Sequence, residues 1–400
     1  MDNATLHMTG RRGQLTRQPA HQSSPIVDIP DPDPDNNVVG IAIAKLQEIL
    51  VSVYQSLENK EVLRVPYKTR PGSRRSRRNP PSAARATRSR SAPSVLQFPG
   101  RTENESIKFT QVLKIIHLSH SSLLSGNPVT KRNLFYQCPD LFKTQAIIDG
   151  LVDDISYTLG IGRDDLNIVA SAKGLLAGPI ILHMRDLSSI SASASDTGVT
   201  IPTTRNISRI DFQHAEWVLV IEKDATFRIL ITGKGVPDLQ TKQFLHLLHS
   251  AKPELPIYGL VDFDPYGVNI MRCYSHGSRG HAHEVGVTVP SMQWLGIKSG
   301  DLVGRQDLED DDAHAEVLDL TVFRRQQSES NFEATDVLKE RDRKIAKTLL
   351  RNIPDDLDEY NIQCRRELQI MLFLNVKAEI QAVDDAGDIS NWLDAHIRRV

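Results

Sequence analysis

The sequence has few cysteines and no long apolar run. Its three cysteines, Cys138, Cys273 and Cys364, are odd in number and widely spaced, which excludes a disulfide framework and a zinc site of the Cys type. The longest apolar runs, such as Trp217 to Ile221, are far shorter than the roughly 20 residues that a membrane-spanning helix needs. The polar N-terminus also lacks the apolar core of a signal peptide. We therefore expect an intracellular protein with reduced thiols and no membrane segment.

Acidic residues are absent from Val62 to Thr102, although the whole chain has 50 of them against 48 basic residues. This segment carries eleven Lys or Arg residues, and subtracting their charge from the net charge of -2 leaves -13 for the remainder. Its Pro, Ser and Arg content is typical of a linker rather than of a domain. The segment can be interpreted as a solvated tether, or as a nuclear-localisation or phosphate-binding patch. The lack of compensating acids favours the patch.

The first hundred residues contain one apolar stripe. Residues 1–37 are polar, and we expect them to be disordered. From Val38 to Leu57 apolar residues recur at helical spacing and predict one amphipathic helix. It must dock either on the main body or on another protein, and both remain open. We assign 38–60 to this possible partner-binding helix and 61–104 to the basic linker.

The pattern after Glu105 predicts three helices followed by two short strands. This order is typical of a winged-helix (CAP-like) domain, a helix-turn-helix variant that docks on duplex DNA. We place this domain at 105–205. The predicted elements are a helix over 109–118, a helix over 131–136 with Thr130 as its N-cap, a helix over 142–159, and strands over 166–170 and 180–183.

From Trp217 the pattern becomes α/β. Near-continuous apolar runs, typical of buried parallel strands, cover 217–221, 229–232 and 257–261, and a helix is expected over 239–248. The fold class is therefore α/β plus α+β, with an α/β domain and a C-terminal extension over 206–400.

Three carboxylates follow two of these strands. Glu222 follows the first, and Asp262 and Asp264 follow the strand over 257–261. Ligands of open α/β sheets bind at the carboxyl ends of the strands. Hard oxygen donors without His or Cys suit Mg²⁺ or Mn²⁺. An Asp-x-Asp before Pro is more often a simple turn, but the strand-end position and Glu222 favour a metal site.

Tyr136 is the candidate nucleophile. An isolated Tyr on an amphipathic helix is more often a packing residue, but Lys131 and Arg132 lie one turn before it. Their cationic groups could hold a phosphate and stabilise a phenolate. Attack of the tyrosine oxygen on phosphorus would conserve the bond energy in a covalent phosphotyrosyl link.

Five stretches in order make the chain similar to a known family. It resembles the meiotic double-strand-break transesterases, which are related to the A-type half of topoisomerase VI, with a fungal-type member expected. The resemblance covers about residues 105 to 385, including a weaker match at Lys377 to Gln381. The five stretches are Val129 to Tyr136, Ala172 to Gly178, Ile221 to Phe227, Ile231 to Asp238 and Val261 to Gly267.

The resemblance implies a winged-helix domain that bears the nucleophile, followed by a metal-binding Toprim domain. By the family's pattern Tyr136 is the catalytic tyrosine, and each tyrosine of a homodimer attacks one strand and stays on the 5′ end. Expected partners are double-stranded DNA, a topoisomerase VI B-like subunit contacted by the helix over 38–60, and other meiotic break-forming factors on nuclear chromosomes. The resemblance also assigns Arg132 to the phosphate, Glu222, Asp262 and Asp264 to Mg²⁺ or Mn²⁺, and Lys131, Arg132, Lys173 and Lys234 to DNA contact.

One departure from the family concerns the segment after Phe227. Only three residues separate it from Ile231, where the family has a longer segment with a helix, and a parallel crossover needs a dozen or more residues. Either the strands are joined differently, or a gene-model or splicing error has removed an exon. We predict the second of these. If the short form is the real protein, Glu222 is misplaced and the chain is a catalytically impaired DNA-binding or complex-assembling form.

Two further motifs are weak. His281-Ala-His283-Glu284 lacks the spacing of a helical zinc motif, and a solvated loop is the better interpretation. Gly233-Lys-Gly235 is not a P-loop, so ATP is expected to belong to a separate B-type subunit. A nuclease that uses metal-activated water is a third functional hypothesis, and it would cleave DNA without Tyr136.

Overall fold

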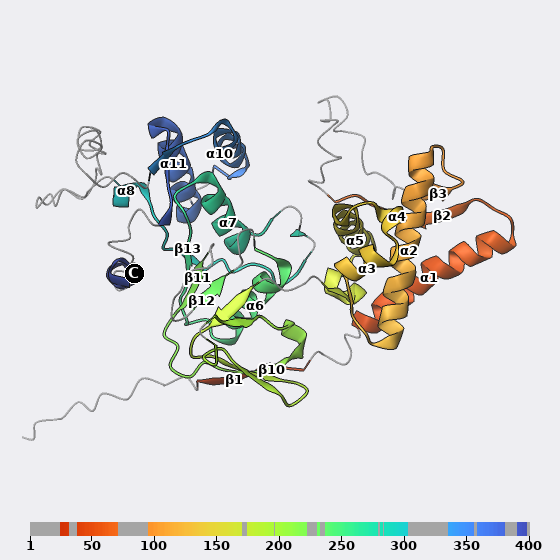
Figure 1. The fold of residues 1–400 in the computed structure, drawn as a ribbon, viewed down its shortest axis with the longest axis horizontal. Helices are drawn as coiled ribbons and strands as arrows, with labels where there is room; N and C mark the ends of the chain where they lie inside the picture. Colours follow the sequence, from red (N-terminus) through yellow and green to blue (C-terminus); the bar gives the residue numbers. More distant parts are fainter. Residues whose placement is uncertain are drawn as a thin grey trace, which may run out of the picture.

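The structure is a computed structural model with two lobes (Figure 1). The helical lobe comprises the described residues from 38 to 169, and the sheet lobe comprises residues 25–31 and those from 174 onward. The described residues are 25–31, 38–70, 95–169, 174–195, 197–221, 230–232, 237–278, 281–282, 284–302, 335–355, 358–380 and 390–397.

Helix α1 (Val38–Glu58) confirms the predicted amphipathic helix and docks on the chain itself. Its buried residues Ala42, Leu46, Ile49 and Val53 belong to one core with α2 (Glu103–Ser125). The Lys45 ammonium donates to the Leu159 carbonyl at 2.7 Å. The rest of the α1 surface is exposed and carries both polar and apolar residues, with exposed fractions of 61% for Tyr54 and 59% for Leu57. Of the two docking surfaces that the sequence left open, α1 uses the main body of the chain.

By length and composition alone, α1 could also cross a membrane. Core helices of soluble proteins meet the same criterion, and the buried stripe of α1 packs in the core of the helical lobe.

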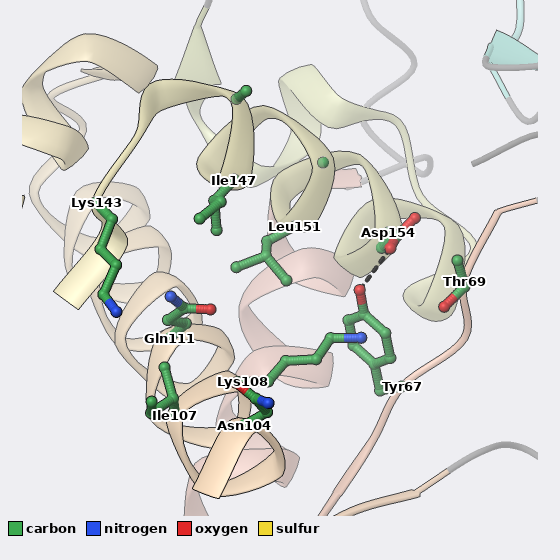
Figure 2. A pocket seen from close by; sticks show the side chains of 12 residues that line it. Tyr67, Thr69, Asn104, Ile107, Lys108, Gln111, Lys143, Ile147, Leu151 and Asp154 are labelled. Carbon is green, nitrogen blue, oxygen red and sulfur yellow. Dashed lines mark hydrogen bonds between the residues drawn. The ribbon is translucent and has the colours of Figure 1, made fainter. Parts of the chain in front are cut away.

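Both ends of the expected basic linker belong to the fold. Strands β2 (Leu63–Pro66) and β3 (Val95–Phe98) pair antiparallel, so the linker prediction over 61–104 is wrong at its ends. Residues 71–94, with most of the arginines, lie outside the described residues. After β2, the Tyr67 hydroxyl donates to Asp154 beside a groove of about 340 Å³ between α2 and α5 (Figure 2). These contacts fix the chain on the lobe before the basic run starts.

The rest of the helical lobe confirms the predicted helices. Helix α3 (Lys131–Gln137) is followed by α4 (Pro139–Phe142) and α5 (Gln145–Leu159), and the turn η3 is Arg163–Leu166. The predicted wing does not form as expected. Strand β5 (Ile168–Val169) pairs with β4 (Val129–Thr130) directly before α3, whereas β7 (Ile181–Met184) lies in the sheet lobe.

The main sheet of the other lobe has six strands in the order β14-β13-β11-β12-β6-β9. The strands β13, β11 and β12 are parallel, as their apolar runs predicted, and β14, which was not predicted, joins them in parallel. Strands β6 and β9 extend the sheet antiparallel. The bounds are β6 (Leu175–Ala177), β9 (Val199–Thr200), β11 (Val218–Ile221), β12 (Leu230–Thr232), β13 (Ile257–Leu260) and β14 (Gln293–Trp294).

A second, antiparallel sheet shares the core of the main sheet, which moves the expected domain boundary. It has the order β1-β10-β7-β8, and Leu182, Ile210 and Phe212 lie in one core with Val220 and the main sheet. Residues from 175 onward therefore pack with the sheet lobe, and not with the domain expected over 105–205. Because β1 is part of this sheet, the expectation of disorder over all of 1–37 is also corrected. The bounds are β1 (Ile26–Asp28), β8 (Ser189–Ser191), η4 (Thr204–Asn206) and β10 (Ile207–Asp211).

Alternating residues of β11 face two different cores, as expected for a strand that is buried on both sides. Val218 and Val220 belong to the core that includes residues of α6, α7, α10 and α11, and Leu219 and Ile221 belong to the cluster that includes Leu393 of α12. The remaining bounds are α6 (Leu239–Ala251), α7 (Pro265–Ser275), α8 (Ser299–Leu302), β15 (Thr335–Val337), α10 (Glu340–Asn352), α11 (Glu359–Leu374), β16 (Val376–Ala378) and α12 (Ser390–Ile397).

Strands β11 and β12 are parallel neighbours despite the short segment between them. Leu219 lies opposite Leu230 and Ile221 opposite Thr232, so the connection must return along the sheet by two residues, about 7 Å. A chain of eight residues can span that distance without a helix. These connecting residues, 222–229, lie outside the described residues. The pairing thus does not by itself require a longer connection, contrary to the expectation from the sequence.

Candidate active site

Helix α3 presents Tyr136 and Arg132 on one exposed face. Thr130 caps the helix as predicted, because its hydroxyl accepts the Asn133 amide at 3.0 Å. Leu134, which is fully buried, anchors the inner face. Tyr136 is 69% exposed, and its ring contacts Phe135 edge-on at 5.6 Å between centroids. Arg132 is exposed and four residues before Tyr136, so the guanidinium and the phenol share a side of the helix.

Lys131 has a different place from the one the sequence suggested. It is buried, with 6% exposed, and its ammonium lies 3.3 Å from Asp149 and 3.5 Å from Asp153 of α5. The i, i+3 spacing of Lys131 and Leu134 puts both on the inner face of α3. Lys131 therefore attaches the tyrosine helix to α5, and only Arg132 of the two cations faces outward.

Asp153 is the centre of the ion pairs that hold the lobe together. Arg70 lies 2.6 Å from its carboxylate, and Arg163 lies 3.8 Å away. Burial alone would raise the pKa of Asp153, but the charges of Lys131, Arg70 and Arg163 together lower it below the ordinary value of 3.8. The carboxylate thus stays charged in the folded protein, with three cations around it.

We expect Asp153→Asn to destabilise the helical lobe by about 3 kcal/mol, because breaking a buried ion pair leaves its cations uncompensated. Asp149→Asn is the control, since Asp149 is 47% exposed, and it should cost less than about 1 kcal/mol. The pKa of Asp153 is lowered on folding, so its stabilisation is complete above pH 3.8 and lost as the pH falls through the folded-state pKa. Urea unfolding at pH 7 and at lower pH measures both effects, and equal midpoints for the two variants would contradict the role of Asp153.

The carboxyl edge of the main sheet holds the predicted aspartate pair and the end of the strand that precedes Glu222. Ile221, the last residue of β11, lies opposite Leu260, the last residue of β13. Glu222 follows the first strand at once, and Asp262 lies two residues after the second. The register therefore brings the ends of these two strands to one edge of the sheet, as the apolar runs predicted. Glu222 itself, like Lys173 and Lys234, lies outside the described residues.

Asp262 and Asp264 form a close pair of carboxylates. Asp262 is 6% exposed, and Asp264 caps α7 by accepting the Gly267 amide at 2.7 Å. Burial, and in smaller part the negative charge of Asp262, raise the pKa of Asp264. Two carboxylates that repel each other at a strand end fit a divalent cation, which would relieve the repulsion. Within the described ranges no group of three possible ligands occurs, so Glu222 is needed to complete the predicted set.

Gly267 allows this turn to close, and we expect Gly267→Ala to disrupt it. A Cβ at this position would lie 2.2 Å from the Asp262 carbonyl oxygen, so the backbone of the aspartate loop must shift. The expected cost is about 2 kcal/mol or more, together with weaker Mn²⁺ binding. Gly150→Ala in the middle of α5 meets open space and should stabilise by about 0.5–1 kcal/mol. Thermal unfolding with and without Mn²⁺ compares the two variants, and unchanged behaviour of Gly267→Ala would contradict the geometry.

The loop with His281 and Glu284 is not a solvated loop, which corrects the interpretation from the sequence. Glu284 accepts the Arg163 amide at 3.1 Å, which joins the two lobes. The His281 Nδ1 lies 3.2 Å from the ammonium of Lys242, and burial followed by the charge of Lys242 lowers the pKa of His281 to about 4. A Gly-rich loop gave no signal of such burial. His283 lies outside the described residues.

Tyr136 and the aspartate pair belong to different lobes. Helix α3 lies in the helical lobe, and β11 and β13 lie in the sheet lobe (Figure 1). One chain thus holds a candidate nucleophile and a candidate metal edge as separate surfaces.

Two family models match the two lobes. Residues 107–168 match the model described as type IIB DNA topoisomerase, which lies within the helical lobe. Residues 217–392 match the Toprim domain that Spo11 shares with the A-type chain of topoisomerase 6, and this range lies within the sheet lobe. The Toprim domain expected from the sequence is therefore present, and it contains the aspartate pair.

Similar proteins include the meiotic recombination protein rec12 of Schizosaccharomyces pombe, 34% identical over 72% of this chain and 76% of the relative. The human meiotic recombination protein SPO11 is 35% identical, and the match covers 49% of this chain and 53% of that protein. The A-type chain of DNA topoisomerase 6 from Arabidopsis thaliana is also 35% identical, over 49% of each chain. The chain thus spans about half the length of these last two relatives. With both lobes matched in order, the chain belongs to the family formed by Spo11 and the A-type chain of topoisomerase 6.

Proposed function

We propose that this protein is a metal-dependent, topoisomerase-like DNA transesterase that makes double-strand breaks to initiate meiotic recombination. The observation that carries the proposal is the outer face of α3, where an exposed tyrosine and an exposed arginine lie four residues apart. In a member of this family, we assign the tyrosine of this pair as the nucleophile and the arginine as the residue that binds the phosphate. The helical lobe docks on duplex DNA in the manner of a winged-helix domain, with α3 directed at the phosphates.

In this reaction the Tyr136 oxygen attacks a phosphodiester phosphorus. A bond forms between that oxygen and the phosphorus, the bond from phosphorus to the 3′ oxygen breaks, and the phenol proton ends on the released 3′ hydroxyl. The product is a 5′-phosphotyrosyl link that conserves the energy of the broken bond. Arg132, one turn before Tyr136, donates to the non-bridging phosphate oxygens and stabilises their negative charge.

Asp262, Asp264 and Glu222 are the residues that would hold Mg²⁺ or Mn²⁺. A divalent cation held there would supply positive charge to neutralise the DNA phosphate. Asp264 needs such a charge, because burial and the neighbouring Asp262 raise its pKa in the absence of the ion. Lys173 and Lys234 are the further residues proposed to contact DNA.

The separation of Tyr136 from the aspartates supports a homodimer on DNA. The tyrosine of one protomer acts with the metal edge of the other, and the two protomers cut one strand each. Two breaks on opposite strands then give a double-strand break with one protomer on each 5′ end.

A B-type partner is proposed on the free face of α1. Val51 and Tyr54 are exposed on the side of α1 opposite the buried stripe, and Val39, Ile41 and Leu57 are exposed nearer to its borders. Exposed apolar side chains that gather on one helix favour contact with another protein. We place the protein in the nucleus, on chromosomes, with the basic segment serving import and nonspecific DNA affinity.

Cleavage of end-labelled duplex DNA by the purified protein with its B-type partner and Mn²⁺ tests the proposal. After denaturation, a 3′ label should stay with the protein and a 5′ label should be released, because the protein stays on the 5′ end of the downstream strand. Free 5′-phosphate ends without an adduct would instead indicate metal-activated water. DNA binding without any cleavage would indicate the catalytically impaired form.

A further inference from the structure

The C-terminal strand β16 pairs directly with the aspartate loop. Phe263, the residue between the two aspartates, donates its amide to the Ala378 carbonyl at 2.8 Å and accepts the Ala378 amide at 3.0 Å. This reciprocal pair fixes the backbone of the loop from one side. The strand lies near the C-terminal end of the range that matches the Toprim model, where the sequence showed only a weak family match and no role.

The next residues of the tail reach the metal ligand itself. The Ile380 amide donates to Oδ1 of Asp262 at 2.9 Å, across 118 residues of sequence. Asp262 is buried, so one donor on one of its oxygens restricts the torsion of the carboxylate strongly. The outer partners of metal ligands commonly orient them in this way.

The sheet holds the Ile380 amide in place. The Ile380 side chain packs against the cluster that contains Leu219 and Ile221, the strand that leads to Glu222. On the other side of Ala378, Lys377 lies 3.8 Å from the buried Asp342, and its positive charge acts on Asp264. The tail therefore acts on the aspartate loop in three ways. Strand β16 pairs with the backbone of the loop, the Ile380 amide donates to Asp262, and the charge of Lys377 acts on Asp264.

We propose that Ile380 is a positioning residue and that docking of β16 prepares the Asp262 carboxylate for its metal ion. This inference rests on the proposed function, because it takes Asp262 and Asp264 as metal ligands. It adds a fixed outer contact to them and gives β16 and Ile380 a role in metal binding. By linkage the effect is reciprocal, so the metal ion should also favour the docked tail.

Ile380→Pro and Ile380→Ala form a matched pair of variants. Both lose the isoleucine side chain, but only proline lacks the amide hydrogen. Mn²⁺ affinity is measured by isothermal titration on the full chain without DNA. We expect Ile380→Pro to bind at least about tenfold more weakly than Ile380→Ala, the range seen for outer partners of metal ligands.

The double variant Asp262→Asn/Asp264→Asn separates the possible failures. If it loses Mn²⁺ binding while the two Ile380 variants bind equally, the positioning role is wrong and the metal site stands. If it binds Mn²⁺ like the unmodified protein, both the metal site and the positioning role are wrong.

Hydrogen exchange of the unmodified chain gives a second test that needs no stable proline variant. The peptide with residues 376–380 should exchange more slowly with Mn²⁺, and this protection should vanish in the double variant. Exchange unaffected by Mn²⁺ would overturn the proposal even if Ile380→Pro failed to fold.

Discussion

Tyr136→Phe should abolish covalent attachment of the protein to DNA, with a fall of at least about 10³-fold in adduct formation. The change removes only the hydroxyl oxygen that attacks phosphorus, and no other group in the proposed mechanism can take its place. Since Tyr136 is 69% exposed and its ring remains, folding and DNA binding should be unaffected. The readout is the amount of labelled DNA that stays with the denatured protein.

Tyr157→Phe is the matched control for this experiment. Tyr157 lies on α5 of the same helical lobe and is half-buried, so the same atom is removed from another helix of the lobe. Adduct formation by purified protein should stay within about twofold of the unmodified chain. Adducts that persist in Tyr136→Phe, or that vanish equally in both variants, would show that Tyr136 is not the nucleophile.

Asp264→Asn should reduce cleavage by at least about 10²-fold without weakening the apo fold. Asparagine keeps the N-cap of α7, because its side-chain oxygen can still accept the Gly267 amide. Burial and the charge of Asp262 raise the pKa of Asp264, so the charged form is disfavoured in the fold. Removing that charge should leave the metal-free protein equally or more stable, by up to about 1 kcal/mol. The stabilisation that Mn²⁺ gives should be lost at the same time.

Asp358→Asn provides the control for the cap. Asp358 caps α11 in the same lobe by accepting the Asn361 amide at 3.0 Å. It is far from Asp262 and Asp264 in the sequence. It should change neither cleavage nor the response to Mn²⁺. Thermal unfolding with increasing Mn²⁺ gives the comparison. An Asp264→Asn protein that is still stabilised by Mn²⁺ as strongly as the Asp358→Asn protein would remove Asp264 from the metal site.

Local sequence patterns predicted the parts of the fold that depend on local physics. The Thr130 cap and the inward Leu134 define α3, and the apolar runs of β11 and β13 end at the expected edge. The candidate site could also be predicted from the sequence, because the residues assigned to it lie near the ends of these elements. Arg132 and Tyr136 could be placed on one face from helical spacing alone.

Contacts between distant parts of the chain could not be predicted in this way. From the sequence, Lys131 is expected to be an exposed cation, but the packing of α3 on α5 buries it beside Asp153. The domain boundary was misplaced because strands of the second sheet have no pattern that reveals which core they join. Nothing in the sequence indicated the hydrogen bond of the Ile380 amide. Every residue except proline has a backbone amide hydrogen, and the partner of this one is 118 residues away.

The most direct test of the central claim is to identify the amino acid that carries the DNA. The protein is immunoprecipitated from meiotic cells under denaturing conditions, treated with nuclease and then with trypsin, and its peptides are examined by mass spectrometry. Cleavage after Arg132 and Lys143 releases residues 133–143, in which Tyr136 is the only tyrosine. We predict a nucleotide, linked through its 5′ phosphate, on this peptide. A nucleotide on a peptide with another tyrosine, or none on any peptide while breaks are forming, would contradict the account.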